Sequence, residues 1–137
     1  MKSFFSFAIF AIILSACSQE AEIKQINVKD YGIEANTKVS ITGAINELIH
    51  NLDDDQVVIS FPKGRYDFYP DSAYFRDYFE SNTYDINPKR LAILLDKKKN
   101  ITIDAQGSDF IFHGHIQPFT LDNSENINIK NVNFDWD

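Results

Sequence analysis

The chain has few cysteines, few basic side chains and no long apolar run, and each of these shortages excludes a class of protein. A single cysteine, Cys17, excludes an internal disulfide. Lys and Arg number 13 against 20 Asp and Glu, which argues against a nucleic-acid partner, because phosphate binding draws on clustered basic side chains. The basic block at residues 97–99 is expected to be a solvated turn. The apolar run at residues 4–14 is shorter than the roughly 20 residues that span a bilayer.

The composition is nevertheless that of one folded domain. The 137 residues are 44% hydrophobic and 14% aromatic, which suffices for a packed core and excludes a disordered tail. The net charge is −7, and removal of residues 1–16 would make it −8, with 12 basic against 20 acidic side chains.

The beginning of the chain carries a targeting signal. Lys2 and the apolar run after it are typical of a secretory signal peptide. The stretch "LSAC", which ends at Cys17, resembles the bacterial lipobox, in which the cysteine is acylated after cleavage. These features predict a signal peptide at 1–16, a lipid on Cys17, a polar tether at 17–25 and anchoring to a membrane of the bacterial cell envelope. The alternative is an ordinary secretory peptide with a spare thiol.

Five segments after the tether carry periodic patterns. Residues 26–32, "INVKDYG", alternate and predict a short strand. Apolar residues at helical spacing predict an amphipathic helix at 40–52. Residues 57–61, "VVISF", and 65–69, "RYDFY", predict strands joined by a tight turn. Paired aromatic residues predict a short helix inside an insertion at 70–86.

The last third of the chain repeats itself. Residues 95–104, "LDKKKNITID", match residues 121–130, "LDNSENINIK", with five identities in ten at an offset of 26. Such a period, built from short strands and polar turns, is typical of a solenoid, and the pattern of leucine-rich repeats is absent. We therefore predict an all-β fold, a right-handed parallel β-helix, with residues 26–137 as its amino-terminal cap and first coils. The helix at 40–52 would cover the open end, and the strand at 131–137 would leave the top face bare.

Longer motifs resemble one family. The order of strand, capping helix and coils resembles the pectate-lyase-like superfamily. Within it, four stretches resemble the amino-terminal part of glycoside hydrolase family 110, the bacterial exo-acting α-1,3-galactosidases: "FPKGRYDFYPD", "ESNTYDINPKRLAILLD", "ITIDAQGSDFIFHG" and "QPFTLDNSENINIKNVNFDWD". The resemblance spans residues 26–137 and implies an inverting hydrolase that removes terminal α-1,3-linked galactose from glycans.

The resemblance also implies limits. The catalytic aspartates of that family lie on later coils, so we expect no catalytic residue here and an inactive amino-terminal fragment, truncated at Asp137. The implied partner is carbohydrate with terminal α-galactosides, and no metal or other cofactor is implied. The oligomeric state stays open.

Acids and histidines near the carboxyl end are candidates for substrate binding. Asp135 and Asp137 flank Trp136, so an inward indole would point both acids outward, either as the floor of a sugar-binding cleft or as solvated strand acids. His113 and His115 in "FHGH" are expected on one side of a strand, either at the cleft or plainly exposed. A metal pair would lack a third ligand at familiar spacing.

Arg90 in "NPKR" is a further binding candidate. It either clamps a carboxylate or forms a structural salt bridge that holds the insertion at 70–90 to the helix. The dense aromatic residues before it are expected mainly in the core, with at most one or two free to stack on sugar. They are Tyr66, Phe68, Tyr69, Tyr74, Phe75, Tyr78 and Phe79.

A second functional class remains open. The chain is also compatible with a non-catalytic β-helix lipoprotein, an envelope glycan-binding module or an adhesin, in which the bare strand is an assembly surface. Paired aspartates in downstream sequence would favour the enzyme, and uniform Asn or Ser ladders would favour the binder. In a third alternative the uncapped coil makes the product unstable, because it exposes strand edges to aggregation.

Overall fold

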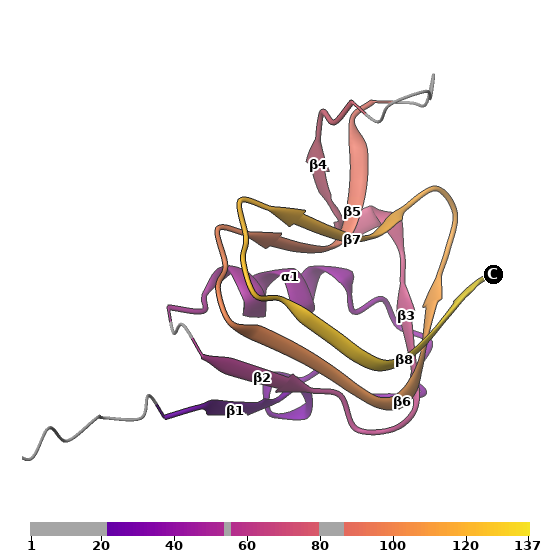
Figure 1. Ribbon diagram of the computed structural model, residues 1–137. Helices are drawn as coiled ribbons and strands as arrows, with labels where there is room; N and C mark the ends of the chain where they lie inside the picture. The colour runs from indigo at the N-terminus through magenta and orange to yellow at the C-terminus, as the bar shows by residue number, and fades with distance from the viewer. Residues whose placement is uncertain (1–21, 54–55, 80–86) are drawn as a thin grey trace, which may run out of the picture.

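The computed structural model describes residues 22–53, 56–79 and 87–137, and this part of the chain consists mainly of strands (Figure 1). The predicted signal peptide at 1–16 and the predicted lipidation site Cys17 lie outside the described residues. None of the helices within these ranges is long and apolar enough to cross a membrane. The elements are, in order, β1 (Lys24–Asn27), a 3-10 helix (Val28–Tyr31), α1 (Thr42–His50), β2 (Val57–Ser60), β3 (Arg65–Phe68), a 3-10 helix (Pro70–Ser72), β4 (Tyr74–Arg76), β5 (Lys89–Asp96), β6 (Ile101–Phe112), β7 (Gln117–Asp122) and β8 (Asn128–Trp136).

Parallel pairing joins most of these strands into two sheets. In the larger sheet, β6 pairs with β2 through its first half, with β3 through its second half and with β8 along both, while β1 pairs with β2. In the smaller sheet, β5 pairs in parallel with β7 and antiparallel with β4. From β5 to β8 the chain alternates between the sheets, and each return places a strand beside the previous one (Figure 1).

The sequence repeat sets the register of this stacking. Equivalent residues of the two repeats lie opposite each other: Leu95 and Leu121, Asp96 and Asp122, and Ile103 and Ile129. Between the sheets, Asn126 donates from Nδ2 to Oδ1 of Asn100 over 2.6 Å. Both asparagines have positive φ, 54° and 53°, a conformation that asparagine tolerates better than most side chains. The repeat seen in the sequence is therefore also a repeat in space.

The hydrophobic core fills the space between the sheets. Inward side chains of β2, β5 and β6 are fully buried, among them Ile59, Leu91, Ile93, Leu95, Ile101 and Ile103. The inward side chains of β8, such as Trp136, are partly exposed. Toward the end of the larger sheet the core becomes aromatic. The ring centroids of Phe68 and Phe112 lie 4.8 Å apart, and those of Phe61 and Phe110 lie 4.9 Å apart, within the range of favourable aromatic pairing.

Helix α1 lies against the edge of β5. Its apolar spacing gives it one buried face, formed by Thr42, Ile45, Asn46, Leu48 and Ile49. From this face Asn46 donates to the carbonyl oxygen of Ala92 over 2.9 Å and accepts from the backbone amide of Leu94 over 3.0 Å. The helix therefore supplies the hydrogen bonds that a neighbouring strand would otherwise supply to this edge.

The basic block has a structural role that its sequence did not indicate. Lys98 donates from Nζ to the carbonyl oxygens of Leu52, over 2.7 Å, and His50, over 3.2 Å, at the end of α1. A cation is favourable there because the last carbonyls of a helix carry partial negative charge. The expectation of a solvated turn is therefore wrong for Lys98.

The predicted strand at 26–32 is shorter than expected. It begins at Lys24, within the expected tether, and ends at Asn27, whose Oδ1 accepts from the amide of Lys29 over 3.0 Å. This contact begins the first 3-10 helix, which Gly32 ends with a φ of 75°. A side-chain cap and a left-handed glycine thus override the alternating pattern.

The predicted helix within 70–86 is wrong for its described part, and residues 80–86 lie outside the described residues. The segment instead forms β4, in which Phe75 lies opposite Arg90 of β5. The Arg90 guanidinium lies 5.0 Å from the centroid of the Phe75 ring. The edge of β5 offers backbone hydrogen bonds that the helical spacing of the aromatic residues does not reveal.

Candidate functional site

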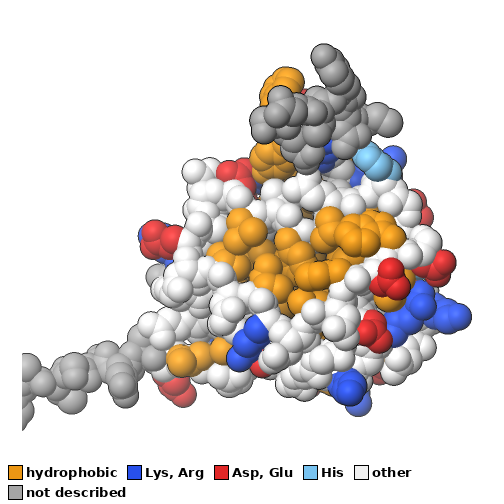
Figure 2. Space-filling model, turned by 45° about the vertical axis from the view of Figure 1, so that its right-hand side comes forward, with side chains coloured by type: hydrophobic (Ala, Val, Ile, Leu, Met, Phe, Trp, Pro, Cys, Tyr) orange, Lys and Arg blue, Asp and Glu red, His pale blue; other side chains and the backbone are white. Residues whose placement is uncertain are grey.

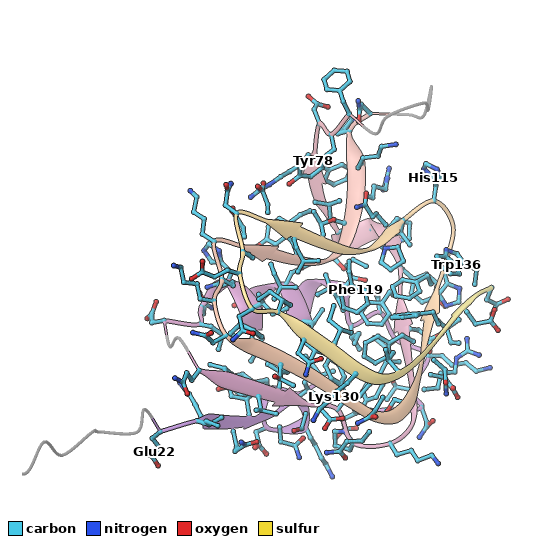
Figure 3. The ribbon with its side chains drawn as sticks, viewed as in Figure 1. Glu22, Tyr78, His115, Phe119, Lys130 and Trp136 are labelled. Atoms are coloured by element: carbon cyan, nitrogen blue, oxygen red, sulfur yellow. The ribbon has the colours of Figure 1, made fainter. Side chains whose placement is uncertain are left out.

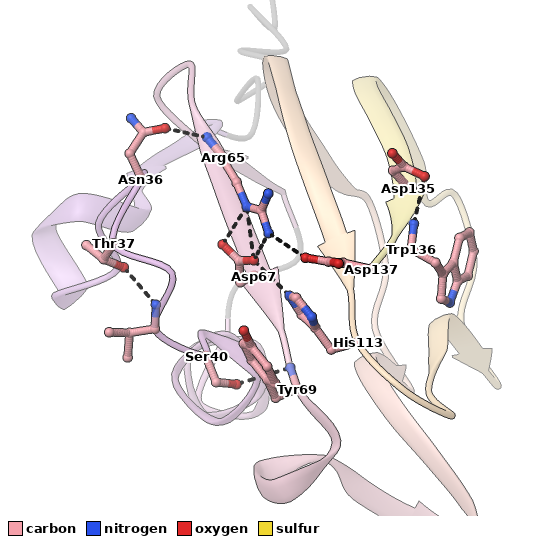
Figure 4. Close-up of polar contacts among 11 residues, drawn as sticks. Asn36, Thr37, Ser40, Arg65, Asp67, Tyr69, His113, Asp135, Trp136 and Asp137 are labelled. Carbon is pink, nitrogen blue, oxygen red and sulfur yellow. Dashed lines mark hydrogen bonds and ion pairs between the residues drawn. The ribbon is translucent and has the colours of Figure 1, made fainter.

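A polar cluster lies on the outer face of the larger sheet, where β3, β6 and β8 end (Figure 4). Inward aromatic side chains alternate with outward polar ones along these strands, and parallel pairing brings the outward ones together. The polar cluster consists of Arg65, Asp67, Tyr69, His113 and Asp137.

Asp67 is the centre of the polar cluster. Its side chain is 0% exposed, and Oδ1 accepts from Nη2 of Arg65 over 2.6 Å and lies 2.8 Å from Nε2 of His113. Nε of Arg65 lies 3.0 and 3.1 Å from the two carboxylate oxygens. Burial would raise the pKa of Asp67, but the hydrogen bonds from Arg65 and His113 outweigh it and lower the pKa. Asp67 is therefore an anion at neutral pH.

His113 is held from two sides. Its ring stacks on Tyr69 with 3.9 Å between centroids and only 2° between planes. Tyr69 is itself fixed, because its backbone amide donates to Oγ of Ser40 over 3.3 Å. The edge of the imidazole is bound by Asp67, so the ring has little freedom to rotate.

The two carboxyl-terminal acids differ in their contacts. Trp136 lies opposite the buried Phe112, and the two ring centroids are 5.4 Å apart, so the indole points toward the core and its neighbours point outward. Asp137 lies 3.5 Å from Nη2 of Arg65 and joins the polar cluster. Asp135 instead accepts from the backbone amide of Trp136 over 2.9 Å.

His115 lies outside the polar cluster. Strand β6 ends at Phe112, and Gly114 with a φ of 63° turns the chain before His115, which is exposed on the connection to β7 (Figure 3). The prediction that His113 and His115 share one side of a strand is therefore wrong. A left-handed glycine breaks the alternation that the prediction assumed.

Arg90 also lies outside the polar cluster. It donates to the carbonyl oxygen of Pro70 over 3.3 Å and contacts the Phe75 ring, so it connects β5 to the segment before and within β4. Its described contacts are the carbonyl of Pro70 and the ring of Phe75 rather than a carboxylate, and they do not involve α1.

The aromatic candidates separate into three groups, of which Tyr69 and Tyr78 form the half-buried one. Tyr66 and Phe68 are fully buried, as expected, whereas Tyr74, Phe75 and Phe79 are exposed, which is more than the one or two expected. Sequence analysis did not select Arg65 or Asp67. The signal was present in "RYDFY", because the same alternation that points the aromatic side chains inward points these two outward.

A second polar group joins β4 to both stacked repeats. Arg76 binds Asp96 over 2.6 Å and Asp122 over 2.9 Å, and the Tyr78 hydroxyl donates to Asp122 over 2.8 Å (Figure 3). The hydrogen bond between Arg76 and Asp96 lowers the pKa of Asp96 and raises the pKa of Arg76. This group holds β4 in place and keeps Asp96 ionised.

Within the described ranges no group of three or more His, Cys, Asp or Glu side chains is placed to hold a metal ion. The arrangement can instead offer hydrogen-bond donors and acceptors from charged and aromatic side chains that are fixed on a sheet.

The fold and the polar cluster define a class: a mostly β protein in which parallel strands stack in two sheets and present ordered polar side chains outward. No family model matches the chain. Several curated proteins, however, match its sequence. The chain is 40% identical over 140 residues to a Bacteroides thetaiotaomicron protein named alpha-1,3-galactosidase B, with 100% of the chain and 23% of the relative covered.

Two further relatives carry related names. A Bacteroides fragilis alpha-1,3-galactosidase B is 34% identical, with 100% of the chain and 24% of the relative covered. A Shewanella woodyi alpha-1,3-galactosidase A is 34% identical, with 83% of the chain and 19% of the relative covered. The chain is therefore homologous over its length to proteins named alpha-1,3-galactosidase, as its motifs predict, and it spans about a quarter of the length of the first two relatives.

Proposed function

We propose that this chain is the amino-terminal part of an exo-acting, inverting α-1,3-galactosidase, a glycoside hydrolase that removes terminal α-1,3-linked galactose from glycans. The observation that carries the proposal is the similarity of the entire chain to proteins named alpha-1,3-galactosidase. The stacked repeats support the architecture proposed with it, a right-handed parallel β-helix that continues beyond β8.

Three carboxyl groups of the described residues do not suit the role of the catalytic acid. An inverting glycosidase needs one carboxylic acid with a raised pKa, so that it is protonated when it meets the leaving oxygen. Asp67, Asp96 and Asp104 instead have lowered pKa values, caused in Asp104 chiefly by a hydrogen bond from Asn131. Because the chain also spans only about a quarter of the length of its first two relatives, we propose that it is inactive alone and that both catalytic carboxyl groups lie outside it.

The test compares this chain with the longer protein encoded when the nucleotide sequence is read beyond codon 137. We expect the longer protein to release free galactose from an α-1,3-linked galactobiose and this chain to release none, measured by a coupled galactose assay. A longer protein that binds the disaccharide without cleaving it would refute the hydrolase and favour the glycan-binding alternative.

A lipid anchor is proposed from the lipobox-like stretch that ends at Cys17. Metabolic labelling with an alkynyl fatty acid should place label on the wild-type protein, in the membrane fraction of the cell envelope. The Cys17→Ser variant should carry no label. Equal labelling of both proteins would exclude acylation of Cys17.

A further inference from the structure

We infer that His113 is a hydrogen-bond acceptor for a sugar hydroxyl, held in one tautomer by Asp67, and that the polar cluster is a subsite for neutral carbohydrate. The inference rests on the proposed function, because it names the part of this chain that meets the glycan. Asp67 has no contact with sugar in this arrangement and acts as a positioning residue.

The tautomer follows from the contact between Asp67 and His113. A carboxylate only accepts hydrogen bonds, and Oδ1 of Asp67 lies 2.8 Å from Nε2 of His113, so Nε2 must carry the hydrogen. In the neutral imidazole the other nitrogen, Nδ1, is then an acceptor. The guanidinium of Arg65 keeps Asp67 ionised by donating to both of its oxygens, which maintains this assignment.

The acceptor is fixed in place and remains available. Stacking on Tyr69 at 3.9 Å fixes the plane of the imidazole, and Asp67 fixes its rotation. Within the described part of the chain, the ring of His113 makes one hydrogen bond, through Nε2, and its side chain is 13% exposed. None of the hydrogen bonds of the described residues uses Nδ1, so this nitrogen keeps its capacity to accept from a ligand hydroxyl.

The surrounding charges select a neutral ligand. Arg65 is partly exposed and offers donors, and Asp137 is exposed 3.5 Å from it and offers acceptors. His113, Arg65 and Asp137 thus offer an acceptor, a donor and an acceptor. Neighbouring sugar hydroxyls can match this order, because each hydroxyl both donates and accepts. An anionic ligand would be repelled by Asp137 and by the net charge of −7. The polar cluster therefore suits a neutral polyol such as a terminal galactose unit.

The first test observes the tautomer directly. The chain has three histidines, so the imidazole nitrogens of His113 can be assigned by ¹⁵N NMR of the wild type and the His113→Gln variant. We expect the Nε2–H tautomer for His113 and a loss of this preference in Asp67→Asn. A predominant Nδ1–H tautomer in the wild-type chain would overturn the inference.

The second test measures binding of α-1,3-linked galactobiose to the chain by titration in the same spectra. His113→Gln keeps an amide donor near the position of Nε2 but has no acceptor at the position of Nδ1, because its carbonyl oxygen is bonded one atom further along the side chain. We therefore expect binding about five- to tenfold weaker, as for one lost hydrogen bond. His50→Gln, at the exposed end of α1, is the matched control and should bind as the wild type does.

The outcomes separate this inference from the proposed function. Unchanged binding in His113→Gln, or binding that leaves the imidazole signals of His113 unmoved, overturns the subsite even where the longer protein is a galactosidase. A loss of binding in His113→Gln but not in His50→Gln supports the subsite, even where the longer protein proves non-catalytic.

Discussion

At the scale of single residues, Asp67 organises the outer face of the larger sheet. Its fully buried carboxylate loses its hydration, and donors from Arg65 and His113 replace the lost water. The same contacts fix His113, and through Arg65 they reach Asp137. One buried charge thus positions side chains from three strand ends.

Replacing Asp67 by Asn should destabilise the chain by about 2–3 kcal/mol at pH 7, because charge-assisted hydrogen bonds are lost while Arg65 keeps its charge. Urea unfolding measures the change. Asp71→Asn, at an exposed position, should change stability by less than about 0.5 kcal/mol.

The same substitution should alter the acid response. The pKa of Asp67 in the folded chain is lowered, so its stabilising contribution is complete above its unfolded value of about 3.9 and is lost as the pH falls through the folded value. Asp67→Asn should therefore lose less stability than the wild type below pH 4. An equal loss in both would contradict the role of Asp67.

Ionisation of Tyr66 should destabilise the folded chain at alkaline pH. Burial raises its pKa to about 12, and its hydroxyl donates to the carbonyl oxygen of Pro62 over 2.7 Å. Because the folded pKa exceeds the unfolded value of about 10, this contribution is complete below pH 10 and is lost as the pH rises toward 12. Wild-type stability should fall by about 2 kcal/mol between pH 9 and pH 11.5, and the stability of Tyr66→Phe should fall less, as urea unfolding at these two pH values would show. The exposed Tyr31→Phe should behave as the wild type does.

At the scale of elements, two segments cover the edge of β5 that does not pair with β7. Strand β4 pairs with its beginning, and α1 reaches the next residues through Asn46. A sheet edge without such partners leaves backbone groups open to other chains. At this edge the backbone carbonyl of Ala92 and the amide of Leu94 therefore depend on the side-chain amide of Asn46 for their hydrogen bonds.

Asn46→Ala should lower the free energy of unfolding by about 3 kcal/mol, because buried backbone groups of Ala92 and Leu94 lose their partners. The amide hydrogen of Leu94 should also exchange faster with solvent. Glu47→Ala, on the exposed side of the same helix, is the control and should change neither quantity appreciably. Unchanged exchange at Leu94 would refute the capping role.

Two elements show where local sequence patterns suffice to predict secondary structure and where they do not. Helix α1 forms where apolar spacing predicts it, because the same side chains that favour a helix also bury its face. At 74–76 the spacing of Tyr74 and Phe75 suggested a helix, but the long-range pairing with β5 decides the conformation. Strand formation depends on a partner that local sequence does not contain.

At the scale of the whole molecule, the face over β7 and β8 is apolar (Figure 2). Leu121 is 51%, Phe134 47% and Trp136 55% exposed, and Phe119 lies between the sheets beside them (Figure 3). A contiguous apolar face of this kind marks a surface that another part of a protein covers.

The chain should therefore self-associate and bind the dye ANS when it is prepared alone. Phe134→Lys should reduce both light scattering and dye fluorescence, because it places a charge within the apolar face. Val39→Lys changes an apolar side chain on a loop that is 66% exposed, more than Phe134, and should leave both signals unchanged. A monomeric wild-type chain without dye binding would show that this face is closed in solution.

The sequence alone determined the mostly β character, the position of α1 and the alternation that points Trp136 opposite to its neighbours Asp135 and Asp137. These properties follow from local periodicity and from a repeat of 26 residues, and both can be read without knowing any long-range contact. The relationship to the galactosidases came instead from the resemblance of longer motifs.

Only the tertiary structure decided the polar cluster. Asp67 and His113 are 46 residues apart and meet because β3 pairs in parallel with the second half of β6. Periodicity tells which face of a strand a side chain occupies, but which outward side chains become neighbours depends on register. The packing of the complete core sets that register, because a slip of one residue would turn every buried side chain outward.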